Sequence, residues 1–504
     1  MVKSSKLFEL VFLICLLANT AQAKDLNPID YGLKECHTGV DRYQAIYNCH
    51  VDALKKDLGV CYKGIDTIYI VIPPEAKSIP LCKRNDFSNC VFLVKNNERK
   101  IPLFTLTNQL VDCDEEWHSL MKTGETKDKS NQLIVIEDTI PWVKERKGYG
   151  YGHTRKDILF VKEGIIQNNT IANYDNYKPR LYKSIIQNCE TKIENLTFIR
   201  DSSSSRITFL FKIENQYGII LNNITTKTPN SDLFEDAIIR MDNCYKVTIL
   251  NTTIEGTYSQ RNKYGYGICL LNVGDVYIRN FKANGNWGVF GNNNVNKIKL
   301  IDCDINRFDI HCYGRDVYFN NCIFRDLYNQ FSSIFGSIVF ERCSFYNSIP
   351  VLFESSYNAY TGFDLYINNC IWNVTTSKNY LISAGNPCYS PNPRKELSDK
   401  CWPNINISNL KILISEDVSD IFLFKVKNGC DVVPHLSYIK DISISDIVIQ
   451  CANDTISFFL VNEPIKFDDS ICIKIVKDNT IVENVKIRYI DKNHILPHIN
   501  KKAK

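Results

Sequence analysis

The sequence predicts an all-β protein built as a right-handed, single-stranded parallel β-helix with a short N-terminal cap helix. Three observations predict this fold. A strand-like motif recurs from about residue 190 onward, every copy except that at 338–345 carries an Asn or Asp at the same point, and cysteines follow the turn residue in consecutive copies. Repeats of this length are typical of solenoids, in which each coil buries its apolar side chains against the next coil.

Each copy of the motif consists of two alternating apolar runs on either side of a turn residue, which is Asn or Asp in every copy except that at 338–345, where it is Arg342. Alternation with a period of two indicates strands with one buried face. Successive turn residues from Asn223 to Asn369 are 19 to 29 residues apart, which suits a coil of about three short strands. The copies lie at residues 192–198, 218–226, 247–254, 276–283, 298–305, 317–324, 338–345, 365–372, 405–412, 442–449 and 480–487.

The turn residue and the cysteine after it support stacked coils. An Asn side chain can bond the local backbone and tolerates left-handed geometry, so matching turns can stack into a hydrogen-bonded ladder. Neighbouring parallel strands lie about 4.8 Å apart, whereas a disulfide needs Cβ atoms about 3.8 Å apart and inclined towards each other. We therefore expect Cys303, Cys322, Cys343 and Cys370 to be buried free thiols that pack as small apolar residues.

Two other folds also give many repeated elements. A β-sandwich prefers hairpin signals such as Asn-Gly, and only Asn284-Gly285 fits that pattern here. A leucine-rich repeat needs helical halves, and no helical periodicity is visible after residue 180. Both alternatives are therefore less favoured than the β-helix.

The two ends of the chain differ from the repeats. Residues 1–23 resemble a secretory signal, with Lys3, Lys6, an apolar run at 10–18 and the small-residue site Ala21-Gln22-Ala23. We expect a secreted protein, periplasmic or extracellular, without a membrane span. Residues 24–180 are predicted to form the cap and first coils, with a helix over 42–58. Residues 181–490 are predicted to form the β-helix repeats, and residues 491–504 a frayed basic tail.

Charge and cysteine content exclude some function classes. The net charge is +4 over 504 residues, and acidic and basic residues are interspersed, so nucleic-acid binding is not expected. Of the 20 cysteines, Cys15 lies in the signal, which leaves an odd number in the mature chain. Cys388 and Cys401 flank a Pro-rich loop and are predicted to form a local disulfide. No C-x-x-C pair occurs, so no structural zinc site is predicted.

The segment 29–53 resembles the opening of the pectate-lyase-like superfamily, in which a strand with Asp-Tyr-Gly and an acidic Gly-rich loop precede a cap helix. The matching residues are Asp30, Tyr31, Gly32, Gly39, Asp41, Gln44, Ala45 and Ile46. The acidic loop is reduced here to residues 38–41. The resemblance implies a β-helix and glycan chemistry as a class, which includes lyases, hydrolases, epimerases and phage tailspikes. The calcium-binding Asp residues and the Arg base of pectate lyases have no match here, so no cofactor is predicted.

The densest group of candidate site residues lies at 306–315. In a strand, Arg307, Asp309 and His311 share one face, while Phe308 and Ile310 point into the core. This predicts a cation, a carboxylate and an imidazole on one outward stripe. The alternative interpretation is a solvated strip of ion pairs.

The residue types indicate possible roles. His311 is suited to proton transfer near neutral pH, and Asp309 could orient it. In a hydrolase, Asp309 would instead pair with Asp236 or Glu354. Arg307 or Arg315 could neutralise a uronate. Further substrate contacts are predicted for Arg240, Lys263, Tyr264, Tyr266, Trp287, His153 and Arg155.

Several of these residues have a second interpretation. Tyr264 and Tyr266 could serve as the acid of a lyase or be surface aromatics, and Trp287 could be a core residue because glycines flank it. His153 and Arg155 could belong to an ordinary surface turn. The sequence therefore predicts a polysaccharide partner, acidic rather than neutral, and cleavage by lyase or hydrolase chemistry. The alternative function is a non-catalytic glycan-binding or adhesion protein. The number of subunits is not predicted.

Overall fold

The computed structural model describes the greater part of the chain from residue 24 to residue 491. The described residues are 24–97, 101–113, 120, 122–143, 153–170, 179–186, 190–204, 208–228, 237–255, 266–284, 288–311, 314–325, 328–332, 334–353, 362–375, 379–384, 403–415, 418, 421–426, 442–445, 447–450, 455–461, 476–477, 480–481 and 486–491. The predicted signal at 1–23, the tail beyond 491 and the Cys388–Cys401 pair lie outside them.

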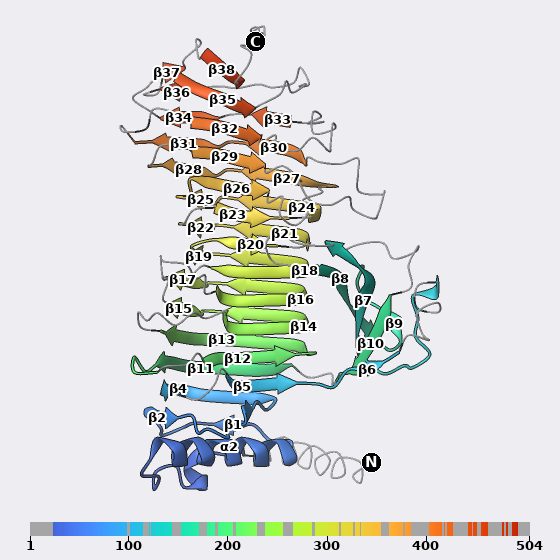
Figure 1. Ribbon diagram of the computed structural model, residues 1–504, viewed down its shortest axis with the longest axis vertical. Helices are drawn as coiled ribbons and strands as arrows, with labels where there is room; N and C mark the ends of the chain where they lie inside the picture. The colour runs from blue at the N-terminus through green and yellow to red at the C-terminus, as the bar shows by residue number, and fades with distance from the viewer. Residues whose placement is uncertain are drawn as a thin grey trace, which may run out of the picture.

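The chain is a right-handed parallel β-helix, as predicted, with its coils stacked along the long axis of the molecule (Figure 1). Each full coil contributes strands to three faces. Face I precedes the Asn turn, face II follows that turn, and face III leads into face I of the next coil. The strands on all three faces pair in parallel with the same face of the neighbouring coil.

The first coils contain β1 (Val60–Cys61), β2 (Thr67–Val71), β3 (Ile79–Pro80), β4 (Arg84–Lys95), β5 (Ile101–Thr107), β11 (Thr191–Arg200), β12 (Thr208–Glu214) and β13 (Tyr217–Lys227). Three long strands then run from face III into face I, namely β14 (Ala237–Leu250), β16 (Tyr266–Arg279) and β18 (Val289–Ile301). Alternate side chains are buried where β14 and β16 run along face I, as expected for a solenoid wall, whereas the face III part of β16 is buried on both of its sides.

In the later coils each face has strands of its own. Face III continues with β20 (Phe308–Ile310), β23 (Tyr328–Phe331), β26 (Ile349–Phe353), β29 (Asn379–Ala384), β32 (Ile421–Val426) and β35 (Thr455–Val461). Face I continues with β21 (Gly314–Asn320), β24 (Ile334–Glu341), β27 (Gly362–Asn368), β30 (Asn404–Ser408) and β33 (Ile442–Ser445). Face II contains β15 (Thr253–Glu255), β17 (Lys282–Asn284), β19 (Asp304–Ile305), β22 (Ile323–Phe324), β25 (Ser344–Phe345), β28 (Ile371–Val374), β31 (Lys411–Ile414) and β34 (Val448–Gln450). The C-terminal strands are β36 (Val476–Lys477), β37 (Thr480–Ile481) and β38 (Lys486–Asp491).

The predicted Asn ladder is confirmed at the turn between faces I and II. Its residues from Asn195 to Asn409 adopt left-handed backbone geometry, with φ between 48° and 62°. The Asn223 amide donates to Asn195 at 2.9 Å, and the Asn280 amide donates to Asn251 at 3.0 Å. A second ladder, not predicted, joins faces III and I through Asn215, Asn243 and Asn272.

The cysteine column is also confirmed. Cys303, Cys322, Cys343 and Cys370 are buried free thiols in consecutive coils. Their sulfur atoms lie near backbone carbonyls, as Cys303 does with Ile301 at 3.2 Å. They fill the wall behind the turn as small apolar residues.

A helix covers the N-terminal end of the solenoid (Figure 1). After the short helix η1 (Pro28–Tyr31), helix α2 spans Gly39–Lys55, close to the predicted 42–58. The side chain of Thr38 accepts from the Asp41 backbone N–H, and the Asp41 carboxylate accepts from the Thr38 backbone N–H, which forms a capping box. Tyr43, Ile46 and Ala53 bury its apolar side against the first coil.

Residues 111–186 differ from the prediction, which assigned the chain up to 180 to the cap and first coils. They form a separate antiparallel sheet beside the solenoid, in the order β6 (Val111–Asp112), β10 (Arg180–Ile185), β7 (Gln132–Val143), β8 (His153–Lys162) and β9 (Ile165–Ile166). We call it the side sheet. The Phe160 ring stacks on Tyr217 at 4.4 Å between centroids, and Asn294 accepts from the Lys156 backbone N–H at 2.9 Å. These contacts join the side sheet to the corner between faces III and I.

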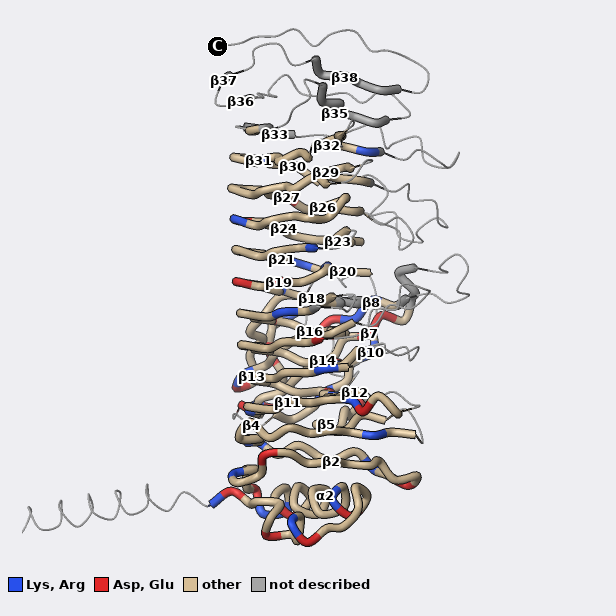
Figure 2. The backbone as a smooth tube through the Cα atoms, turned by 90° about the vertical axis from the view of Figure 1, so that its left-hand side faces the viewer, with Lys and Arg blue, Asp and Glu red and all other residues tan. Residues whose placement is uncertain are grey.

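Charges are scattered over the solenoid wall, with Lys and Arg interspersed among Asp and Glu (Figure 2). Within the described residues, no helix has both the length and the apolar character needed to cross a membrane.

Candidate functional site

The register of face III brings the predicted residues of 306–315 together with side chains from other coils. β20 pairs with β18 on one side and with β23 on the other, so that Asp309 lies beside Phe290 and Gln330. Phe308 and Ile310 point into the core, as predicted. Arg307, Asp309 and His311 therefore lie on the outer side of the wall.

The outer side of this strand is covered rather than solvated. Arg307 is 1% exposed and Asp309 is 0% exposed, whereas the His311 side chain is 17% exposed. This burial corrects the picture of an open stripe, and it equally rules out a solvated strip of ion pairs. Of the three residues, His311 is the one that reaches solvent.

Arg307 and Asp309 form a buried ion pair. Arg307 donates from Nε to Asp309 Oδ1 at 2.8 Å, and its Nη2 also donates to Oδ1. The same nitrogen donates to Gln330 at 3.2 Å, and the guanidinium lies 4.1 Å from the centre of the Tyr328 ring. Burial alone would lower the pKa of Arg307, but the Asp309 carboxylate raises the pKa above its ordinary value. The cation is thus committed to Asp309, and the expectation that it grips a substrate uronate is not supported by this geometry.

Tyr266 links the ion pair to His311. It lies two coils before Asp309, and its hydroxyl donates to Asp309 Oδ2 at 2.8 Å. The same hydroxyl is 3.5 Å from His311 Nε2, and that nitrogen is 3.9 Å from Asp309 Oδ2. Tyr266 is buried, so it is not the surface aromatic that was one of its predicted roles.

A glycine lets the strand of the site fit against its neighbour. Gly288 has a φ of 131°, and a Cβ atom built on it would lie 2.0 Å from the backbone oxygen of Arg307. The backbone N–H of Val289 donates to that same oxygen at 3.0 Å. A side chain at position 288 would therefore displace the residue that carries the guanidinium.

The other described cations do not gather around His311. Arg240 on β14 pairs with Asp242 at 3.0 Å, and Arg315 on β21 donates to the Thr170 carbonyl at 2.9 Å. Arg155 is buried in the side sheet, where it pairs with Asp138 at 3.0 Å. This buried position on β8 corrects the prediction that Arg155 contacts the substrate, and it equally corrects the alternative of a surface turn. His153 is the first residue of β8.

The remaining predicted residues lie outside the described part of the chain and keep their status as sequence predictions. They are Asp236, Lys263, Tyr264, Trp287 and Glu354.

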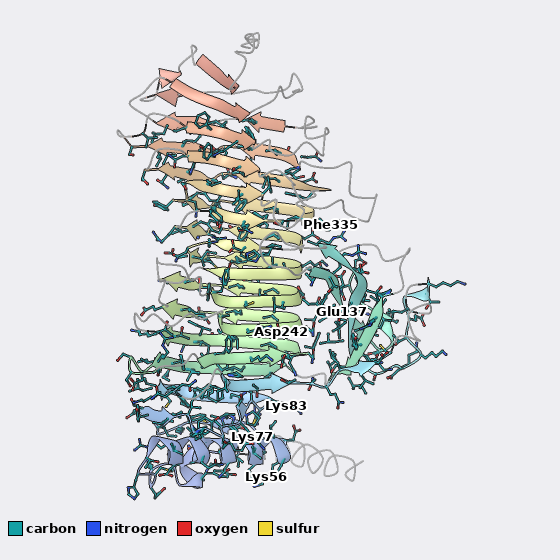
Figure 3. All side chains as sticks on the ribbon, in the orientation of Figure 1. Lys56, Lys77, Lys83, Glu137, Asp242 and Phe335 are labelled. Atoms are coloured by element: carbon teal, nitrogen blue, oxygen red, sulfur yellow. The ribbon has the colours of Figure 1, made fainter. Side chains whose placement is uncertain are left out.

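Several residues of the site were not predicted. Gln330 and Tyr328 contact Arg307 from the next coil, and the Asn329 side chain accepts from the Phe308 backbone N–H at 2.9 Å. Gln330 and Asp309 are the same number of residues before the next turn residue of the ladder, so this spacing could have predicted that they lie side by side. A second pair was also missed: Asp242 lies beside Glu214 in the register of β12 and β14. Burial raises the pKa of the Asp242 carboxyl. Asp242 is labelled on the solenoid in Figure 3, where Glu137 marks the side sheet.

The site can support proton transfer by an imidazole. Two buried groups lie on the inner side of His311: the Asp309 carboxylate, which Arg307 holds in place, and the Tyr266 hydroxyl, which donates to that carboxylate. Among the described residues, no group of three His, Cys, Asp or Glu side chains is arranged to hold a metal ion.

Comparison with solved structures agrees with this architecture and places the chain among the right-handed parallel β-helix proteins by fold. The tailspike protein gp49 from Pseudomonas phage LKA1 is similar with a TM-score of 0.51 and 11% identity, over 89% of this chain and 84% of that chain. That similarity establishes a shared fold, and it carries no information about activity.

Two further structures are less similar. The Gp54 tailspike of Acinetobacter baumannii bacteriophage AP22, in complex with A. baumannii capsular saccharide, has a TM-score of 0.41 and 10% identity, over 92% of this chain and 79% of that chain. PfbA, a surface adhesin of Streptococcus pneumoniae, has a TM-score of 0.29 and 12% identity, over 91% and 94%. No protein-family model matches the chain, and no curated protein matches it either.

Proposed function

We propose that this protein is an extracellular enzyme that binds a polysaccharide across face III and cleaves it by proton transfer through His311. The observation that carries the proposal is the Tyr266 hydroxyl, which lies 2.8 Å from Asp309 Oδ2 and 3.5 Å from His311 Nε2. A phenol reaches across two coils to join a buried carboxylate to the one partly exposed member of the cluster. Extended ligands suit a solenoid because successive coils present successive contacts.

The geometry favours lyase chemistry over hydrolysis. Hydrolysis needs two carboxylates that reach the sugar, and Asp309 is fully buried and bonded to Arg307 and Tyr266. In a lyase, His311 would remove the proton from the carbon next to a uronate carboxylate. A carbon–carbon double bond then forms, the bond to the glycosidic oxygen breaks, and His311 returns the proton to that oxygen. An acidic polysaccharide is therefore the proposed substrate class.

Asp309 and Tyr266 would position the imidazole in this reaction. Asp309 presents Oδ2 to Nε2 of His311 at 3.9 Å and is held by Arg307. A carboxylate behind an imidazole stabilises the imidazolium that forms when the proton is taken.

The experiment is incubation of the full chain with a panel of acidic and neutral polysaccharides. Ultraviolet absorbance of unsaturated product and release of reducing ends are followed together. We expect both signals on an acidic polymer, and their loss in His311→Ala. His37→Ala is the matched control, because His37 is exposed beside the cap helix and far along the chain from the site. Reducing ends without unsaturated product would indicate a hydrolase, and binding without either signal would indicate an adhesin. Either result contradicts the proposed reaction.

A further inference from the structure

Face I carries a row of outward side chains that the site on face III does not use. We call it the tyrosine row, and its members in chain order are Thr248, Tyr277, Lys299, Tyr318, Val339, Tyr366 and Asn406. Each member pairs directly with the next across neighbouring coils. Their strand neighbours, such as Ile278 and Phe319, are fully buried, so the row itself points away from the core.

The tyrosines recur at every second coil. Tyr277 and Tyr318 flank Lys299, and Tyr318 and Tyr366 flank Val339. With coils about 4.8 Å apart, successive rings lie about 10 Å apart along the solenoid axis. That distance is close to the length of a disaccharide unit in an extended glycan. A tyrosine offers an apolar ring face with a polar end, which suits the C–H face and the hydroxyl groups of a sugar.

The charge of the row is positive. Lys299 is its one charged member, is exposed, and has its Nζ 5.2 Å from the centre of the Tyr318 ring. The Tyr318 hydroxyl accepts from the Asn320 amide at 2.9 Å, which fixes the orientation of the ring. Beside the row, Arg279 is balanced by Asp302. The cation of Lys299 therefore lies over the Tyr318 ring, in the coil between Tyr277 and Tyr318.

We propose that the tyrosine row is a second polysaccharide-binding surface, which holds an extended acidic glycan along face I. Sugars would stack on Tyr277, Tyr318 and Tyr366, and a carboxylate on an intervening sugar would meet Lys299. A polymer whose neutral and acidic sugars alternate fits this arrangement. The proposal rests on the proposed polysaccharide function but involves a different face and different residues from His311.

A second copy of the chain fits the row less well. The core of a protein interface is depleted of charged residues, and Lys299 lies between two of the tyrosines of the row. The row members other than the tyrosines and Val339 are polar, namely Thr248, Lys299 and Asn406. A carbohydrate uses such a mixture of ring faces and polar groups, whereas interfaces between copies of a chain are more apolar than the rest of the surface.

The experiment measures binding of hyaluronan fragments, whose acidic and neutral sugars alternate, to full-length protein carrying His311→Ala so that no polymer is cleaved. Neutral cello-oligosaccharides are the comparison ligand. We expect the combined change of Tyr277, Tyr318 and Tyr366 to Ala to weaken hyaluronan binding at least tenfold. Lys299→Ala should reduce the preference for hyaluronan and its sensitivity to salt. Tyr346→Ala is the control, because Tyr346 is an exposed tyrosine following β25 on face II.

Three outcomes overturn the proposal: hyaluronan does not bind, the combined tyrosine variant binds as tightly as its parent, or that variant changes the sedimentation of the protein as an interface between copies would. The proposed function fails separately. If His311 variants and their parent both lack lyase activity while the tyrosine row still binds hyaluronan, the cleavage proposal is wrong and this surface remains.

Discussion

Asp309 has donors for both carboxylate oxygens although no part of it touches solvent. Arg307 donates to Oδ1 and Tyr266 to Oδ2. An ion pair of this kind becomes costly when one partner is removed, by about 3–5 kcal/mol, because a buried charge is left without compensation. A loss of activity in an Asp309 or Arg307 variant would therefore not separate an effect on folding from an effect on the chemical step. Tyr266 is the better residue for testing the role of the network.

Tyr266→Phe keeps the ring and removes the hydroxyl from Asp309 and His311. We expect the free energy of unfolding to fall by about 1–2 kcal/mol and kcat on an acidic polysaccharide to fall roughly tenfold or more, because the imidazole loses its support. A steady-state pH profile should show the acidic limb of kcat shifted as well, because that limb follows protonation of the catalytic base. A fall in stability with unchanged kcat and an unchanged pH profile would mean that Tyr266 is only structural.

Gly288→Ala tests the close approach of two backbones at the site. The added Cβ would meet the Arg307 carbonyl oxygen at 2.0 Å, so β18 and β20 must separate. We expect a loss of about 2–3 kcal/mol in urea unfolding together with loss of activity. Gly124→Ala is the matched control: Gly124 also has a positive φ, of 69°, but no atom lies within 4 Å of its added Cβ. Equal losses in the two variants would show that backbone geometry alone sets the cost.

At the scale of single elements, the turn and the strand after it were the most predictable parts of the chain. The Asn column and the period-two alternation act within a few residues, so the sequence alone indicates them. The buried contacts of the site were not predictable in the same way. Arg307 is covered by Tyr328 and Gln330 from the next coil and linked through Asp309 to Tyr266 from an earlier one. Such contacts depend on how coils of unequal length align.

The cysteine column gives a prediction at this scale. Burial raises the pKa of the Cys343 thiol well above its usual value, so little thiolate forms there, and all four thiols of the column are buried away from a reagent in solution. We expect iodoacetamide to leave Cys303, Cys322, Cys343 and Cys370 unmodified in the folded protein. After denaturation without a reductant, peptide mass spectrometry should find all four alkylated. A cross-linked pair among these peptides would contradict the assignment of free thiols.

At the scale of the whole molecule, the sequence indicated a solenoid with a capped end but not the side sheet. The apolar runs at residues 133–136 and 158–161 are typical of strands, yet their antiparallel pairing follows from long-range register rather than from a turn signal. The sheet also changes the solenoid beneath it. Asn294, one coil beyond Asn272, accepts from the backbone of β8 rather than extending the second Asn ladder. Docking of this kind has no local sequence pattern.

The cap helix at the N-terminal end of the solenoid should make the stability of the protein depend on pH through His50. This residue of α2 is fully buried, with Nδ1 2.8 Å from the Pro80 carbonyl oxygen and Nε2 2.8 Å from the Tyr62 hydroxyl. Burial lowers the pKa of His50 to about 4, from the usual value of about 6.5 that applies in the unfolded chain. Between these pH values the unfolded state binds more protons than the native state, so stability falls as the pH decreases.

The expected size of this effect is up to about 3 kcal/mol, since each pKa unit corresponds to roughly 1.4 kcal/mol. It should appear as a decrease in the free energy of unfolding, measured with urea, as the pH falls from about 6.5 to 4. The first coil should also become exposed at a lower urea concentration. His50→Asn can still donate to Pro80 but has no imidazole to protonate, so its stability should vary less over this range. Because an uncovered solenoid end exposes apolar strand edges, wild-type protein should also associate more readily near pH 4 than the variant. Parallel pH curves for the two proteins would show that other groups control the acid sensitivity of the cap.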